Sequence, residues 1–141
     1  METTVNTRVI FSARRRLGHA NTNETITYND VSINIGEGMN GSTGTFTVPV
    51  SGLYAFSFSA LTAEDDPFTD IKVYQNDEDQ FRIVDHNKNE QKNMSNIGYS
   101  WYMRLEQNDK VYLKVISNVL ICTKSSLVWF SLMHKSNSSF S

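Results

Sequence analysis

The chain has 141 residues, of which 39% are hydrophobic and 20% are charged, with a formal net charge of −2. This length suits one globular domain with its own core, and the slightly acidic charge does not suggest a nucleic-acid-binding protein. No run approaches the roughly 18 apolar residues of a membrane helix, and the single cysteine, Cys122, excludes an internal disulfide.

Short apolar segments separated by turn residues begin at the N-terminus. An apolar segment at Val9–Ala13 (VIFSA) is followed by three arginines, and residues 14–16 are predicted as a loop. Glycine-rich turns follow at residues 36–38, 41–44 and 51–52. Each turn ends one short segment and begins another, which indicates strands rather than helices.

From Tyr54 onward the apolar residues alternate with a period of two. One predicted sheet face carries Tyr54, Phe56, Phe58 and Ala60. A hairpin follows over residues 99–115, with its turn at Asn108–Asp109, and a last strand is expected over residues 127–133. Another turn is predicted at residues 76–77, and no segment of 10 to 12 residues shows a helical apolar stripe. The pattern predicts an all-β sandwich or jelly roll.

Several predicted strands carry apolar side chains on both faces. Tyr112 and Ile116 lie opposite the face of Val115, and Trp129 lies opposite Val128 and Phe130. A sandwich buries one face of each sheet, so a second apolar face indicates an oligomer interface. The alternative is that long Lys and Tyr side chains cover patches that face solvent.

Eight residues between Tyr28 and Phe58 stand at the spacing of a known signature: Tyr28, Asn34, Met39, Phe46, Gly52, Tyr54, Phe56 and Phe58. With Val9–Ala13 in the place of the family's first strand and residues 127–133 in the place of its last, these residues resemble the C1q globular-head domain family. The resemblance implies a ten-stranded jelly-roll β-sandwich of two five-stranded antiparallel sheets (C1q/TNF-like). It also implies a homotrimer that is secreted and is not an enzyme.

The resemblance divides the chain into an N-terminal extension (1–6), a C1q-like globular domain (7–135) and a C-terminal tail (136–141). No collagen-like Gly-X-Y repeat precedes the domain, so we expect a stand-alone or an excised head. The N-terminus METTVNTR lacks an apolar signal region. Asn-x-Ser/Thr sequons are compatible with secretion; they lie at Asn23, Asn40, Asn93 and Asn137.

Residues that would carry catalysis do not form a known pattern. His19, His86 and His134 belong to no catalytic signature, and Gly36-Glu37-Gly38 reads as a turn rather than a phosphate loop. We therefore expect no enzymatic activity and no required cofactor.

Acidic residues suggest calcium as the one candidate metal. Asp65, Asp66 and Asp70 cluster around Pro67 and offer the hard oxygen ligands that calcium takes. The alternative is a solvated charged loop between two strands. The resemblance adds Asp85, at a position where some family members hold calcium near the three-fold axis.

Two substitutions beside Asp85 bear on that second calcium position. His86 and Asn93 stand where carboxylates occur in the family, which should weaken calcium binding. If His86 lies near its symmetry mates, protonation would make the trimer pH-sensitive.

Two polar segments are candidates for ligand binding. Arg14, Arg15 and Arg16 could grip carboxylates or phosphates of sialic acids or lipopolysaccharide, or could be a solvated loop or a protected edge. In the segment His86–Asn96, the amides of Asn87, Asn89 and Asn93 suit sugar hydroxyls. Trp101 and Trp129 could stack on sugars, but their places in alternating strands favour packing.

Together these observations predict a secreted, lectin-like pattern-recognition protein of innate immunity. It would bind glycans, lipopolysaccharide or other anionic surface molecules through a trimeric head, without nucleic acid and without membrane insertion. Two alternatives stay open: a trimeric TNF-like signalling ligand that binds a protein receptor, and a structural matrix protein.

Overall fold

The computed structural model describes residues 8–16, 18–62, 68–86, 95–117, 120–121 and 128–135. Its strands are β1 (Ile10–Arg15), β2 (Asp30–Ile35), β3 (Met39–Asn40), β4 (Thr45–Thr47), β5 (Gly52–Thr62), β6 (Phe68–Gln75), β7 (Glu78–His86), β8 (Ser95–Leu105), β9 (Lys110–Ser117), β10 (Leu120–Ile121) and β11 (Val128–Lys135).

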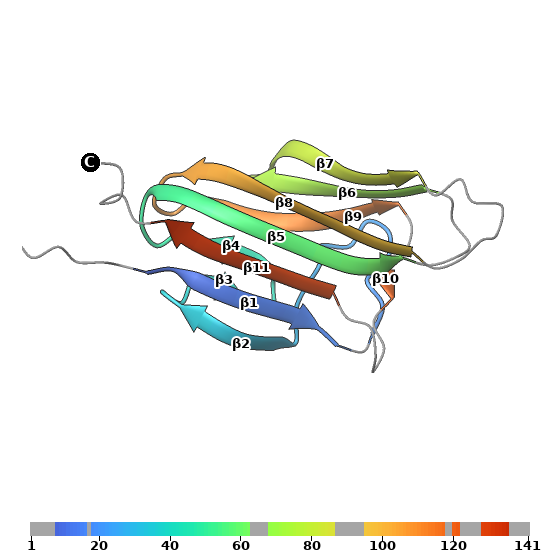
Figure 1. Cartoon of the computed structure of the whole chain (residues 1–141), viewed down its shortest axis with the longest axis horizontal. Helices are drawn as coiled ribbons and strands as arrows, with labels where there is room; N and C mark the ends of the chain where they lie inside the picture. The colour runs from blue at the N-terminus through green and yellow to red at the C-terminus, as the bar shows by residue number, and fades with distance from the viewer. Residues whose placement is uncertain are drawn as a thin grey trace, which may run out of the picture.

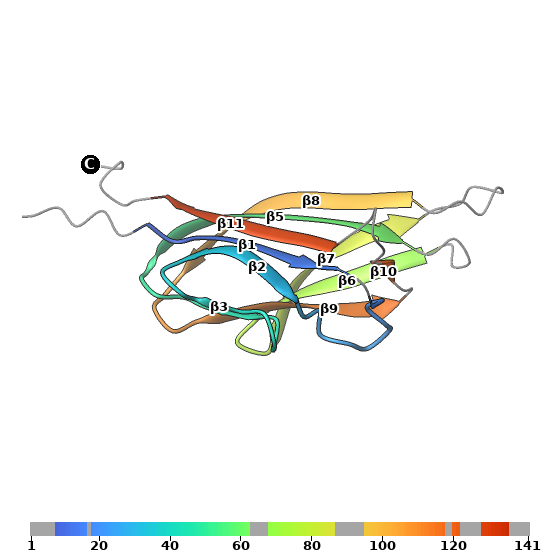
Figure 2. The ribbon, with the colours of Figure 1, turned by 90° about the horizontal axis from the view of Figure 1, so that it is seen from below.

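The strands form two antiparallel sheets that pack face to face as two layers (Figure 1, Figure 2). Sheet A has the order β8-β5-β11-β1-β2, and the two-residue β10 pairs with β5 beyond the end of β11. Sheet B has the order β3-β4-β9-β6-β7. The predicted sandwich of two five-stranded sheets is confirmed, with β10 as a short addition to sheet A.

Alternation along each strand decides which side chains enter the space between the sheets. On β5 the even positions from Tyr54 to Ala60 are buried, whereas Ser57 and Ser59 are exposed. On β9, Val111, Leu113 and Val115 are buried in the same way. The period-two pattern of the sequence therefore correctly predicted which side chains face the space between the sheets.

Phe130 of β11 lies at the centre of an aromatic core. Its ring centroid is 5.0 Å from that of Phe11, 5.7 Å from that of Phe56 and 5.9 Å from that of Tyr28. Aromatic pairs at such distances each add about 0.5–1.5 kcal/mol beyond the burial of their surface. The signature residues from Tyr28 to Phe58 thus include the rings that join the two sheets.

Left-handed residues make the hairpin turns. Asn76 and Asp77, with φ of 51° and 70°, connect β6 to β7, and Asn108, with φ of 74°, precedes β9. Asn and Asp tolerate this conformation better than other non-glycine residues. The signature residue Asn34 closes the β2–β3 turn, because its Nδ2 donates to the carbonyl of Met39 over 2.8 Å.

Two sequence-based placements were wrong. Arg14 and Arg15 are not in a loop, because β1 keeps its pairing with β11 as far as Arg15↔Val128. Asp70 is not in a solvated loop either; it lies in β6, pairs with Ser117 of β9 and is buried. Among the described residues, no helix is long and apolar enough to cross a membrane.

Candidate functional site

The outer face of sheet A carries exposed large hydrophobic side chains on strands β2, β8 and β11. The strand register aligns Tyr102, Ala55, Met133, Ile10 and Ile35 in one row across the sheet. Tyr102 is 74% exposed and Met133 is 63% exposed. We call this surface the apolar face; its exposed large hydrophobic residues are Ile33, Ile35, Tyr102, Trp129 and Met133.

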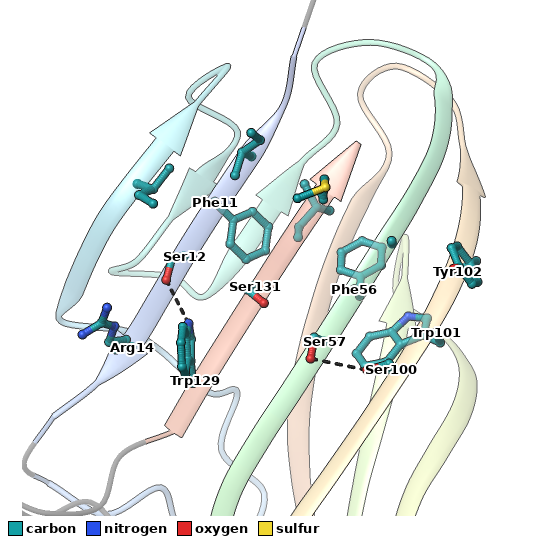
Figure 3. Close-up of a pocket in the computed structure, with 15 residues that line it drawn as sticks. Phe11, Ser12, Arg14, Phe56, Ser57, Ser100, Trp101, Tyr102, Trp129 and Ser131 are labelled. Carbon is teal, nitrogen blue, oxygen red and sulfur yellow. Dashed lines mark hydrogen bonds between the residues drawn. The ribbon is translucent and has the colours of Figure 1, made fainter. Parts of the chain in front are cut away.

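A groove of about 500 Å³ runs across the apolar face. The next row of the register is Ser100, Ser57, Ser131 and Ser12, and these small side chains form its floor (Figure 3). Taller side chains, including Tyr102 and Trp129, form its sides. The groove therefore arises from small residues placed between large ones on a continuous sheet.

Trp129 is fixed on this face by a polar and a cationic neighbour. Its Nε1 donates to the hydroxyl of Ser12 over 2.8 Å, and the guanidinium carbon of Arg14 lies 5.2 Å from its ring centroid (Figure 3). A cation over an indole ring is attracted by the π-electrons. Arg14 is the one charged residue that lines the groove, among the residues that the structure describes.

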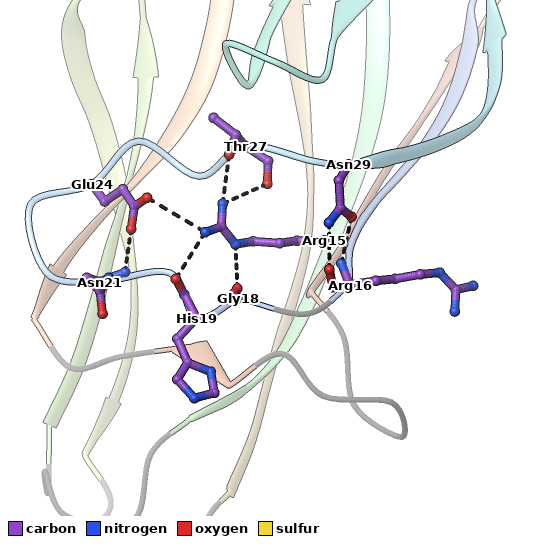
Figure 4. Close-up of polar contacts among 8 residues, drawn as sticks. All are labelled: Arg15, Arg16, Gly18, His19, Asn21, Glu24, Thr27 and Asn29. Carbon is purple, nitrogen blue, oxygen red and sulfur yellow. Dashed lines mark hydrogen bonds and ion pairs between the residues drawn. The ribbon is translucent and has the colours of Figure 1, made fainter.

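Arg15 does not line this groove; it organises the loop between β1 and β2 (Figure 4). Its Nε donates to the carbonyl of Gly18 over 2.8 Å, and its Nη2 donates to the carbonyl of His19 over 3.0 Å. Its Nη1 donates to the hydroxyl of Thr27 over 2.7 Å, and its Nη2 also forms an ion pair with Glu24 at 3.7 Å. Each nitrogen of the guanidinium group thus has a partner within the chain.

Arg16 lies at the edge of the same loop. Its Nε is 2.7 Å from a carboxylate oxygen of Asp30. Its backbone N–H and carbonyl both bond the side chain of Asn29, at 2.8 and 2.6 Å (Figure 4). The three consecutive arginines therefore have three different partners and do not converge on one point.

Asp70 is the predicted acidic residue whose side chain the structure describes. It is 3% exposed; its Oδ2 lies 3.6 Å from Nε of Arg82, and its Oδ1 makes no hydrogen bond to a described residue. No group of three or more His, Cys, Asp or Glu residues that could hold a metal occurs in the described part of the chain. Asp85 pairs with Thr69 across β6 and β7.

The remaining predicted contacts lie outside the described residues: Asp65, Asp66, Asn87, Asn89 and Asn93. The two tryptophans differ in position. Trp101 is buried and stacks on Phe56 at 5.4 Å, whereas Trp129 is exposed on the apolar face. The predicted packing role fits Trp101 within the core and Trp129 within the apolar face.

Sequence reasoning missed two sets of residues. The serine floor follows from the exposed positions of alternating strands, so Ser57 and Ser131 could have been found from their period. A polar pocket on the outer face of sheet B, lined by Tyr112 and Lys114, carries no local signal because its parts are far apart in the chain.

A family model described as the C1q domain matches residues 10–140. Among solved structures, the globular domain of zebrafish complement 1qA protein is 17% identical, with a TM-score of 0.74 over 92% of this chain and 99% of that chain. Murine APRIL at pH 5.0 is 10% identical, with a TM-score of 0.69 over 91% and 99%. Eiger TNF from S. frugiperda is 7% identical, with a TM-score of 0.66 over 91% and 94%.

None of the curated protein sequences matches significantly. The structural likenesses show the shared jelly roll, while the family match covers nearly the whole chain. The chain therefore belongs to the C1q domain family, which is non-enzymatic and whose members are generally secreted and typically form trimers.

Proposed function

We propose that the chain is the subunit of a secreted homotrimeric recognition head that binds anionic groups on glycans, lipopolysaccharide or other surface molecules. The main evidence for trimer formation is the apolar face. Continuous apolar surface with large exposed side chains such as Tyr102 and Met133 marks an interaction site on a soluble protein.

A second apolar surface lies where the edges of the two sheets meet. Phe81 of β7 packs on Tyr99 of β8 at 5.8 Å, and Tyr99 and Val84 are exposed there. The groove on the apolar face and this edge are different surfaces. Contact between them is head-to-tail, and such contacts can close into a ring of subunits.

Trimer formation would place Arg14 within the subunit contact, because it lines the groove. All three nitrogens of the Arg15 guanidinium group already donate hydrogen bonds to residues of the β1–β2 loop. Of the three arginines, Arg16 alone would then remain accessible, in its ion pair with Asp30. Asn87, Asn89 and Asn93 stay in the proposal as ligand contacts on the basis of sequence.

Light scattering tests the assembly. We expect a mass near three times the 16.1 kDa of one chain. Tyr102→Glu should reduce the mass to that of a monomer, since it places a charge in the contact. The matched control is Lys110→Glu, an exposed position on β9 of sheet B, which should leave the mass unchanged. A monomeric wild-type protein would overturn the trimer.

A glycan and lipopolysaccharide array, run with calcium and again with chelator, tests recognition. Three copies of a weak site in one head should give selective binding through avidity. Signal that disappears in chelator would support the proposed calcium role of Asp65, Asp66, Asp70 and Asp85. A blank array together with tight binding to one receptor protein would replace the recognition proposal by the TNF-like alternative.

A further inference from the structure

A small polar pocket lies on the outer face of sheet B, on the opposite side of the sandwich from the apolar face. It has a volume of about 200 Å³. Residues from three strands and two loops line it: Thr25, Thr43, Thr45, Tyr74, Tyr112 and Lys114. A trimer that covers the apolar face would leave this pocket open to solvent.

Two stacked tyrosines form its aromatic wall. Tyr74 of β6 and Tyr112 of β9 are directly opposite in the register, with ring centroids 5.0 Å apart and planes 4° apart. The hydroxyl of Tyr112 donates to Oδ1 of Asp77 over 2.9 Å. Stacking and this hydrogen bond hold the Tyr112 ring in one orientation before any ligand arrives.

Threonine hydroxyls line the other side of the pocket. Thr25 forms an antiparallel bridge with Lys114 of β9. Thr45 lies in β4, next to Phe46, which pairs with Val111 of β9. The hydroxyls of Thr25 and Thr45 make no hydrogen bond to a described residue. A hydroxyl both donates and accepts, as the hydroxyls of a sugar do.

A glycine brings these threonines together. Gly44, with φ of 76°, lies against the carbonyl of Ile26, and a Cβ at position 44 would collide with that oxygen. The turn can therefore pack on the segment that contains Thr25. The backbone thus builds a concave site from two segments that are separate in the sequence.

Lys114 supplies the charge. Its neighbours on sheet B are paired: Lys72 lies 3.6 Å from Asp79, and Arg82 lies 3.6 Å from Asp70. Lys114 is half-buried and forms no ion pair with a described residue. Glu24, beside Thr25 in sequence, already accepts from the backbone of Asn21 and pairs with Arg15.

We propose that this pocket binds an acidic monosaccharide unit. The ammonium group of Lys114 pairs with the sugar carboxylate, the hydroxyls of Thr25 and Thr45 bond its hydroxyls, and Tyr112 packs against its apolar edge. The inference rests on the proposed recognition function and names both the ligand class and a location for it.

Saturation-transfer NMR titrations with sodium glucuronate, glucose and sodium acetate test the pocket. Glucuronate should bind more tightly than either glucose or acetate, because it alone offers a carboxylate on a polyhydroxylated ring. Lys114→Gln should weaken glucuronate binding by about ten-fold, the effect of losing one charge-assisted hydrogen bond. It should leave glucose binding unchanged.

Thr45→Val keeps the shape of the side chain and removes its hydroxyl, so it should weaken the binding of both glucuronate and glucose. The matched control is Lys110→Gln, an exposed lysine on the same strand that lies outside the pocket. Light scattering of every variant checks that the assembly is intact.

The possible results distinguish a failure of this pocket proposal from a failure of the proposed recognition function. Equal binding of acetate and glucuronate would overturn the sugar site and leave only an anion site. Glucuronate binding that Lys114→Gln does not change would overturn the location. A positive glycan array without monosaccharide binding at this pocket would overturn the inference and leave the recognition function standing.

Discussion

The imidazole of His134 occupies the space beside Gly52: a Cβ added to Gly52 would lie 2.5 Å from Nε2 of His134. His134 also packs on Tyr54, with ring centroids 4.6 Å apart. Gly52 has no positive φ, so its backbone conformation does not require glycine. The signature glycine is needed here because a ring from the last strand fills the place of its side chain.

Gly52→Ala should therefore destabilise the protein. The methyl group forces His134 or the start of β5 to move, and overpacking of this kind costs about 1–3 kcal/mol. Urea unfolding measures the change. Gly98→Ala is the control, because the nearest atom to its added Cβ is a backbone oxygen 3.5 Å away. A Gly98 variant as unstable as the Gly52 variant would contradict the explanation.

His134→Leu should raise the free energy of unfolding. Both ring nitrogens of His134 are buried and make no hydrogen bond to a described residue. Replacing an unsatisfied polar group with an apolar side chain of similar size removes a desolvation penalty of about 1–3 kcal/mol. The urea midpoint should increase for Leu and decrease for His134→Gln, which buries an amide instead. A lower midpoint for Leu would indicate that the nitrogens have partners in solution.

Local pattern was enough to predict the core. Tyr54, Phe56 and Phe58 alternate within one strand, so their shared face follows from the sequence alone. Tyr28 and Phe46, two further residues of the signature, are buried in the same core. The division into two five-stranded sheets came from that resemblance and not from periodicity.

The candidate sites depend on register between distant strands, which local pattern does not contain. Arg15 belongs to β1 only because Val128 pairs with it. Asp70 follows Pro67 and three carboxylates and so looked like a loop residue, yet it pairs with Ser117. The pocket on sheet B arises in the same way, from the pairing of Thr25 with Lys114.

Arg15→Ala should destabilise the protein by about 2 kcal/mol, since it removes the part-buried, charge-assisted hydrogen bond to the hydroxyl of Thr27 along with the contacts to the carbonyls of Gly18 and His19. Arg15→Lys should not restore stability, because an ammonium group cannot reproduce the planar arrangement of donors. Urea unfolding compares both with Arg16→Ala, which removes an exposed ion pair and should change stability by less than about 1 kcal/mol. Equal losses at both positions would contradict the anchoring role of Arg15.

Stability should fall in strongly alkaline solution because the fold raises the pKa of two tyrosines, Tyr54 and Tyr112. Burial, together with the hydrogen bond to Asp77, raises the pKa of Tyr112 from 10.0 to about 12. Burial also raises the pKa of Tyr54 to about 12, although its hydrogen bond to the carbonyl of Val50 opposes this shift. The folded state holds these protons more tightly than the unfolded chain does. The stabilisation is therefore complete below about pH 10 and is lost as the pH rises from 10 to about 12.

Tyr112→Phe should make this alkaline decline shallower, since one of the tyrosines no longer titrates. Urea unfolding at several pH values gives the slope of stability against pH. An unchanged slope in the variant would show that Tyr112 ionises in the folded protein as it does in the unfolded chain.

Ser131→Tyr should separate the subunits without unfolding them. Ser131 lies on the floor of the groove and points out of the sandwich, opposite the buried side chains of Phe130 and Leu132. A tyrosine there fills the groove that the neighbouring subunit is proposed to occupy, while the core is unchanged. Light scattering should show a fall to the 16.1 kDa of one chain, and the urea midpoint of the monomer should match that of monomeric Tyr102→Glu. Thr47→Tyr adds the same side chain to the outer face of sheet B and should leave the trimer intact. A trimeric Ser131→Tyr variant would place the subunit contact elsewhere, because no second subunit could seat in a filled groove.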